Sequence, residues 1–206
     1  MSLTILGIGT ATPERQILQR DAVELAAAFT EPSHAHDRRL AALYRHTRVH
    51  SRGSVLLEDP GAASWAQTFF PPASAAEPNG PATKTRMDRY AAEAGPLATA
   101  AAARALSTGR IDARDVTDLV TCSCTGFANP GVDLDLVATL GLSAAVTRTH
   151  VGFMGCHGAF NALRVAEAFV AARPDSVPLV VCVELCSLHF PVSLYTSPSP
   201  RDQRGS

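Results

Sequence analysis

From residue 115 onward, short apolar segments alternate with segments of helical period, and this alternation limits the folds open to the chain. The apolar segments read VTDLVTCSC, AVTRTHVGF and VPLVVCVEL. Between them lie DLDLVATLGL and a helix expected from about residue 156 to residue 172. Short strands that alternate with helices are typical of α/β units whose sheet is covered by helices. The sequence therefore predicts an α/β fold with a largely buried sheet.

The first half of the chain predicts a strand and two helices. Residues 3–10 have the apolar pattern of a buried strand, and residues 17–29 have apolar side chains at helical spacing. The alanine-dense residues 87–106 suit a closely packed helix. Gly95 and Pro96 should bend this helix or split its first turn, because proline removes a backbone donor.

Composition places the chain among ordinary globular proteins. Of its 206 residues, 46% are hydrophobic and 18% are charged, which suits one compact unit with a substantial core. The 18 Lys and Arg nearly balance the 19 Asp and Glu, so no overall field selects for nucleic acid or for an acidic membrane. The first residues lack the pattern of a secretory signal, and no apolar run reaches transmembrane length. We expect a cytoplasmic protein.

The apolar pattern ends before the last segment, SLYTSPSPRDQRGS. This segment is dominated by Ser, Pro, Arg and Asp, and it resembles the peptide encoded by sequencing-adaptor DNA. We therefore expect one domain over residues 1–190 and a non-native or disordered tail over residues 191–206. On this interpretation the natural sequence ends near Phe190.

Cys156 is the strongest candidate for chemistry, in the segment VGFMGCHGAFNALRVAEAF. A strand runs into Gly155 and a helix follows at once, so the sulfur would face unpaired N–H groups at the positive end of the helix dipole. Both features favour the thiolate, which is the nucleophilic form of cysteine. Gly152, Gly155 and Gly158 would permit a tight turn and the close approach of a substrate chain. A small buried cysteine in a packed helix start is the alternative.

Four segments together resemble one family, the type III polyketide synthases, also called the chalcone and stilbene synthases. They read GIGTATP, DLVTCSCTGFANPGVDLDLVATLGL, GFMGCHGAFNALRVA and VVCVELCSLHF, in the family's order and at its approximate spacing. The segments CHGA and CSLHF resemble the bacterial branch of the family more than the plant branch. The resemblance implies the N-terminal half of a thiolase-like fold, with a mixed sheet, helices and the nucleophilic cysteine at the start of a buried helix.

The resemblance also implies an acyltransferase activity. Members of the family load an acyl group from coenzyme A onto the cysteine, here Cys156, and extend it with malonyl units by decarboxylative Claisen condensation. A thioester intermediate splits the transfer into two easier steps. A histidine and an asparagine from the C-terminal half assist in the family, and His157 and Asn161 of this chain do not match them. The chain by itself is therefore expected to be inactive.

Family positions for substrate binding can be carried over to this sequence. The arginine-rich residues 38–52 are candidates for holding coenzyme A phosphates, and Arg39 occupies the position of a cationic phosphate ligand. A solvated helix face is the alternative for this run. The family positions that line the acyl pocket fall on Cys124, Thr125, Cys186 and His189. Their alternative role is that of ordinary core residues at strand ends.

The family's assembly and cofactor use give further expectations. The loop at residues 129–131 matches one that reaches across a dimer interface, so the full-length protein is expected to be a homodimer. Plant relatives carry methionine where this chain has Asn129, which changes the shape of the partner's cavity. Coenzyme A thioesters are the expected substrates, acyl-CoA as starter and malonyl-CoA as extender. No cofactor, metal, nucleic acid or membrane partner is expected.

Two other interpretations of these residues were open. An initiating ketoacyl-carrier-protein synthase or a hydroxymethylglutaryl-coenzyme A synthase would also place a cysteine at a buried helix start. A metal-binding module would have to use the cysteines, yet no CxxC pair is present and their odd number fits reduced thiols. The possible ligands in such a module are Cys122, Cys124, Cys156, His157, Cys182 and Cys186.

Overall fold

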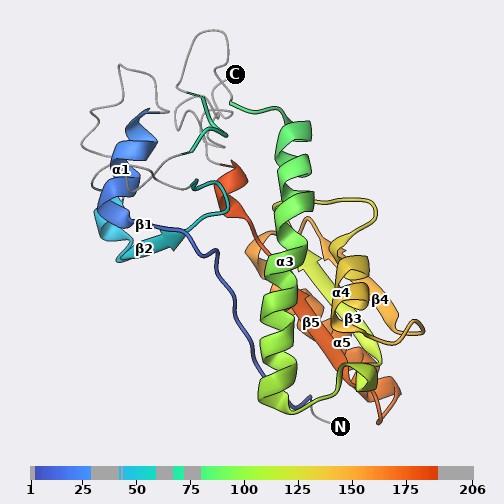
Figure 1. The fold of residues 1–206 in the computed structure, drawn as a ribbon. Helices are drawn as coiled ribbons and strands as arrows, with labels where there is room; N and C mark the ends of the chain where they lie inside the picture. The colour runs from blue at the N-terminus through green and yellow to red at the C-terminus, as the bar shows by residue number, and fades with distance from the viewer. Residues whose placement is uncertain (1–2, 29–41, 43, 59–66, 72–79, 190–206) are drawn as a thin grey trace, which may run out of the picture. The chain divides into compact units, whose positions relative to one another are not determined.

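The computed structural model describes residues 3–28, 42, 44–58, 67–71 and 80–189 (Figure 1). Contacts divide the chain into two compact units. The larger unit comprises Met1–Thr12 and Arg86–Leu188, and the smaller unit comprises Pro13–Thr85 and His189–Ser206. No helix within the described part of the chain has the length and apolar character needed to cross a membrane. The predicted domain boundary near residue 190 and the predicted tail lie outside the described residues.

A parallel sheet of three strands forms the centre of the larger unit. Its order is β4-β3-β5, so β3 is the middle strand. In register, Cys122 of β3 lies opposite Val151 of β4 and Cys182 of β5. Every residue of β3 is buried, as expected for the central strand of a sheet covered on both faces. The strands are β3 (Asp118–Ser123), β4 (Thr147–Gly152) and β5 (Pro178–Cys182).

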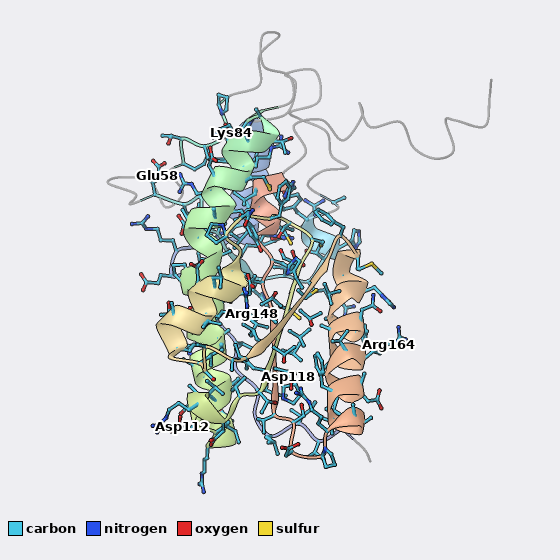
Figure 2. All side chains as sticks on the ribbon, turned by 90° about the vertical axis from the view of Figure 1, so that its right-hand side faces the viewer. Glu58, Lys84, Asp112, Asp118, Arg148 and Arg164 are labelled. Carbon is cyan, nitrogen blue, oxygen red and sulfur yellow. The ribbon has the colours of Figure 1, made fainter. Side chains whose placement is uncertain are left out.

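Helices cover both faces of this sheet. Val120 and Cys122 point toward α5 (Gly158–Ala172), where they pack with Ala162. Figure 2 shows α5 on one side of the strands, and α3 (Thr83–Gly109) and α4 (Val132–Leu140) on the other. The connection through α4 leads from β3 to β4, and the connection through α5 leads back to β5 on the opposite edge. Right-handed crossovers in opposite directions place their helices on opposite faces. The predicted α/β unit is confirmed, but of its predicted buried sheet only β3 is wholly buried, and no residue of the edge strand β4 is.

The long helix α3 runs uninterrupted past Gly95 and Pro96, so the predicted split does not occur. Pro96 is exposed, which leaves the carbonyl that loses its donor within reach of water. Gly95 is buried, and a Cβ there would lie 2.7 Å from Oδ2 of Asp135 in α4. The glycine therefore permits α4 to approach α3 closely.

Residues 3–10 do not form the predicted strand. They run extended beside α3, and a Cβ on Gly7 would lie 2.3 Å from the carbonyl oxygen of Ala105. Leu6 and Ile8 are exposed. The apolar pattern is that of a strand. Within the described residues, however, no strand of either sheet pairs with this segment. A strand needs a hydrogen-bonded neighbour, so pattern alone did not decide the structure.

The smaller unit contains a short antiparallel pair of strands and a helix. β1 (Gln16–Leu18) pairs antiparallel with β2 (Ser51–Gly53), and α1 spans Gln19–Ala28. The predicted helix over residues 17–29 is therefore confirmed, with its first two residues in β1 instead. Ile17 and Leu57 form the core of this unit together with Ala22 and the partly buried Tyr44.

Candidate active site

Cys156 lies in the turn that joins β4 to α5. After β4 ends, Phe153 and Gly155 both adopt left-handed backbone conformations, with φ of 60° and 63°. A single 3₁₀ turn, Gly155–His157, carries the cysteine, and α5 begins at Gly158. The predicted strand, glycine, cysteine and helix are all present in this order. The α-helix itself begins two residues later than predicted, after the 3₁₀ turn.

The backbone of this turn is unusual at Phe153. A non-glycine residue with positive φ costs on the order of 1 kcal/mol or more, and such residues cluster at functional sites. Gly155 adopts the same conformation without that cost, and a Cβ there would have no heavy atom within 4 Å. Backbone conformation, not lack of space, therefore favours glycine at position 155. The turn leaves Cys156 exposed.

Gly158 has a different role from the one predicted for it. A Cβ at this buried position would lie 2.7 Å from Sγ of Cys122 in β3. The glycine thus permits the first turn of α5 to rest on the central strand. The sequence predicted that this glycine lets a substrate chain approach closely. In the structure it is the protein's own core that lies close to it.

The four other cysteines are also free thiols, and Cys182 and Cys186 are exposed like Cys156. Burial raises the pKa of Cys122 to about 11, and nearby Cys182 and Glu184 add to the effect. Burial likewise raises the pKa of Cys124 to about 11, helped by a hydrogen bond to Glu184. The pKa values of Cys182 and Cys186 are also raised, first by burial. Within the described residues, no three His, Cys, Asp or Glu side chains are grouped so as to hold a metal ion.

Glu184 is a site residue that the sequence did not reveal. It lies two residues beyond β5, and its carboxylate accepts hydrogen bonds from the segment that follows β3. The backbone N–H of Cys124 donates to Oε1 at 2.9 Å, and that of Thr125 donates to Oε2 at 3.0 Å. The Thr125 hydroxyl donates to Oε2 at 2.6 Å. One carboxylate therefore joins the carboxyl ends of two neighbouring strands.

Thr125 completes this connection in the other direction. Its Oγ1 accepts a hydrogen bond from the backbone N–H of Leu185 at 2.8 Å while its proton goes to Glu184. The hydroxyl is thus both donor and acceptor, and Thr125 is buried. A signal for this contact did exist in the sequence, namely a lone carboxylate directly after an apolar strand. Its partners, about 60 positions earlier, are visible only in the fold.

Two predicted pocket residues come together with the predicted nucleophile. Cys124 and Cys186 both lie close enough to Cys156 for its negative charge to raise their pKa values. In the parallel sheet, the connection after β3 leads to α4 on one face and the connection after β4 leads to α5 on the other. Ligands of such sheets bind in the crevice at the carboxyl ends where neighbouring connections diverge. Cys124 and Cys156 lie at this position.

The other predicted site residues are less closely tied to this group. His189 is the exposed last residue of a 3₁₀ turn, Cys186–His189, and belongs to the smaller unit. Arg39 lies outside the described residues, as does Arg38. Neither His157 nor Asn161 makes a described hydrogen bond to Cys156. Asn161 instead accepts one from Arg164 at 3.1 Å, and Arg164 points outward from α5 in Figure 2.

Large apolar side chains are exposed near Cys156. Phe153 is 77% exposed and Phe160 is 64% exposed. Phe127, in the segment after β3, is 55% exposed, and its ring centroid lies 6.0 Å from that of Phe153. Clustered apolar side chains on a surface mark a place where a ligand or another protein surface binds.

The smaller unit has an open cavity of about 370 Å³ beside the described part of the arginine run. Arg45 lines this cavity, whereas Arg52 does not line it and instead contacts two of its lining residues, Gln19 and Tyr44. Its Nε donates to Oε1 of Gln19 at 2.6 Å, and its guanidinium lies over the ring of Tyr44. Arg52 therefore holds the smaller unit together. The other lining residues are Leu18, Gln19, Arg20, Val23, Tyr44, Val49 and His50.

The sequence matches a protein family over nearly its whole length. The profile described as "Chalcone and stilbene synthases, N-terminal domain" matches residues 2–200. Among curated proteins, the chain is 36% identical over 186 residues to "Alpha-pyrone synthesis polyketide synthase-like Pks18" of Mycobacterium tuberculosis. That alignment covers 90% of this chain and 44% of the relative. The chain therefore spans less than half the length of this relative.

Solved structures give the same picture. PKS-I from the brown alga Ectocarpus siliculosus aligns with a TM-score of 0.79 and 31% identity, covering 93% of this chain and 50% of that one. The C-terminal type III polyketide synthase domain of Steely1 from Dictyostelium aligns with a TM-score of 0.77 and 26% identity. That alignment covers 92% of this chain and 49% of the Steely1 chain.

Proposed function

The chain belongs to the chalcone and stilbene synthase family and has its thiolase-like α/β fold, and from this we propose that the whole protein is an acyltransferase that makes polyketides. The proposed substrates are an acyl-CoA starter and malonyl-CoA. Membership of this family favours the polyketide branch over the ketoacyl-carrier-protein synthase and hydroxymethylglutaryl-CoA synthase alternatives. One observation supports the proposal most. Cys156 is exposed in a sharp turn between a parallel strand and a helix, at the carboxyl end of the sheet.

In the proposed loading step, the Cys156 thiolate attacks the carbonyl carbon of the acyl-CoA. The bond between that carbon and the coenzyme A sulfur breaks, and coenzyme A leaves and takes up a proton. The acyl group is then held as a thioester on Cys156. In the extension step, malonyl-CoA loses carbon dioxide, the resulting carbanion attacks the thioester, and Cys156 leaves as thiolate. Hydrogen-bond donors near the reacting oxygens would stabilise the charge that develops in both steps.

Substrate binding and catalysis are divided between different portions of the whole protein in this proposal. Cys124, Thr125 and Cys186 supply part of the wall of the acyl pocket, and His189 and Arg39 are the further proposed substrate contacts. The catalytic histidine and asparagine that the family uses are assigned to sequence that follows this portion. The 206-residue chain is therefore proposed to load an acyl group, but only slowly. A homodimer and a cytoplasmic location are proposed for the whole protein on the same grounds.

The proposal can be tested by mass spectrometry of the purified chain after incubation with a fatty acyl-CoA. The expected result is one acyl group, located on the peptide that contains Cys156. The Cys156→Ala variant should remain unmodified, and the matched variant Cys182→Ala should be acylated like the original. Acylation elsewhere, or equal acylation of Cys156→Ala, would rule out the assignment. In the whole protein, α-pyrones are the first products to search for, because Pks18 is named for their synthesis.

A further inference from the structure

Glu184 occupies a special place among the residues around the proposed nucleophile. It follows β5, it is bonded to the segment that follows β3, and Cys186 stands only two residues beyond it. We propose that Glu184 is the positioning residue of the acyl site. Its carboxylate ties the two walls of the pocket together and keeps the neighbouring thiols from competing with Cys156 for the acyl group. This inference rests on the proposed function of Cys156.

The hydrogen-bond pattern favours a carboxylate at this position. The groups that donate to it include the N–H groups of Cys124 and Thr125 and the hydroxyl of Thr125, and the thiol of Cys124 also bonds to it. An ionised carboxylate offers only acceptors, and hydrogen bonds to a charged acceptor are about twice as strong as neutral ones. Glutamine would present one NH₂ group to these donors. It has nearly the same shape, but it cannot satisfy the same partners.

The hydrogen bonds of Glu184 fix the positions of the proposed pocket residues. Parallel strands have no direct connection at their carboxyl ends, so the segments that leave them can spread apart unless side chains join them. Here the Thr125 hydroxyl donates to Glu184 and accepts from the backbone N–H of the next residue, Leu185, so the two segments are bonded in both directions. Cys124 is therefore bonded directly to this carboxylate, and Cys186 lies two residues beyond it in the chain. Both are also close to Cys156, so the distance from nucleophile to pocket wall depends on this tie.

The charge of Glu184 has a second effect. Burial is the larger cause of the raised pKa values of Cys124 and Cys186, and the Glu184 carboxylate raises both further. The charged or titratable groups that face Cys124 are Glu184, Cys156 and Cys186, and those that face Cys186 are Glu184 and Cys156. Neutral thiols are poor nucleophiles. The carboxylate therefore disfavours the transfer of an acyl group to Cys124 or Cys186.

The test compares Glu184→Gln with the matched variant Glu167→Gln, whose residue is exposed on α5. Iodoacetamide labelling at pH 8 is followed for each cysteine, and Cys122, which is 3% exposed, reports unfolding if it becomes labelled. In Glu184→Gln, the labelling of Cys124 and Cys186 relative to Cys156 should rise about three- to tenfold, the effect of half to one pKa unit. Acylation of Cys156 should fall about tenfold or more. Glu167→Gln should match the original chain in both measurements.

Two further variants separate position from charge. Glu184→Asp keeps the charge but shortens its reach, so acylation should fall while the labelling of Cys124 and Cys186 stays low. Thr125→Val removes the shared hydroxyl and should lower acylation, whereas Thr125→Ser should restore it. If Glu184→Gln unfolds, this threonine pair decides the question.

Unchanged labelling ratios together with unchanged acylation in Glu184→Gln, with Cys122 still protected, would overturn the inference. Equal acylation of the two threonine variants would do the same. If the original chain is not acylated at Cys156 at all, the proposed function fails instead. The labelling ratios would still show whether Glu184 controls the neighbouring thiols.

Discussion

The ring of Tyr90 in α3 lies against the backbone of Gly126, so closely that a Cβ on Gly126 would be 2.1 Å from Cγ of the ring. Tyr90 is buried, and Gly126 directly follows Thr125. The long helix on one face of the sheet therefore supports the segment that Glu184 ties in place. A side chain at position 126 would have to move either the ring or the site.

Gly126→Ala should accordingly destabilise the fold by about 1–3 kcal/mol, because overpacking forces shifts in a close-packed core. Denaturant unfolding measures this difference. Tyr90→Ala provides the control, since it opens a cavity and should make the added methyl group much less costly in the double variant. Additive losses in the two variants would contradict the contact.

Among the cysteines, Cys156 should react first with iodoacetamide at pH 8. Cys122 and Cys124 have pKa values of about 11, so at that pH they hold little thiolate. The labelling of Cys124 should rise about tenfold per pH unit until the pH approaches its pKa, whereas Cys122 is buried and should stay unlabelled as long as the protein is folded. Peptide mapping at several pH values follows each site. Uniform labelling at pH 8, or labelling that spares Cys156, would remove it as the nucleophile.

Sequence reasoning found the elements that local pattern determines. The strand, glycine, cysteine and helix around Cys156 depend on neighbours within a few positions, and these were predicted nearly to the residue. The same holds for the alternation that produced the sheet. The segment at residues 3–10 was misjudged because strand formation depends on a pairing partner. Glu184 was missed because the groups that define its role are remote in sequence.

Asp118 lies at the opposite end of the sheet from Cys156, at the start of β3 (Figure 2). Burial alone would raise its pKa, but hydrogen bonds from Ser176 at 2.6 Å and Thr117 at 2.7 Å and an ion pair with Arg173 hold the pKa below its usual value. A carboxyl group whose folded pKa is lowered stabilises the fold above its unfolded pKa. That stability is lost as the pH falls through the folded pKa.

Asp118→Asn should therefore lower the free energy of unfolding by about 1–3 kcal/mol at pH 7. The loss is at the low end for a buried ion pair, because Arg173 is half-exposed and water screens its charge. The difference from the original chain should shrink as the pH falls below about 3.9. Chemical unfolding at several pH values measures it. Asp112→Asn breaks an exposed pair with Arg114 and should change stability less. A difference that grows toward acid pH would contradict the role given to Asp118.

The tail prediction is still open to a direct test. Deleting residues 195–206 should leave solubility and the melting temperature unchanged, because Ser- and Pro-rich sequence has too few apolar side chains to pack. The family match reaches residue 200, so deleting residues 201–206 alone is the matched control. Lower stability in the longer deletion only would show that part of the tail belongs to the fold.

The last prediction concerns what the 206-residue chain can do without the rest of the protein. Acyl loading needs a thiolate and an accessible sulfur, and Cys156 is exposed at the start of α5, so slow loading from a fatty acyl-CoA should survive. Decarboxylation of malonyl-CoA needs donors that stabilise the developing enolate, and the loss of one such donor costs on the order of a hundredfold or more in rate.

Condensation by the chain alone should therefore be undetectable. The assay incubates it with a fatty acyl-CoA and labelled malonyl-CoA and follows carbon dioxide and polyketide products, with Cys156→Ala as control. Loading without condensation is the expected result. Turnover that depends on Cys156 would mean that side chains within these residues complete the site, with His157 and His189 the first to test. The division of work proposed for the two portions of the protein would then have to be abandoned.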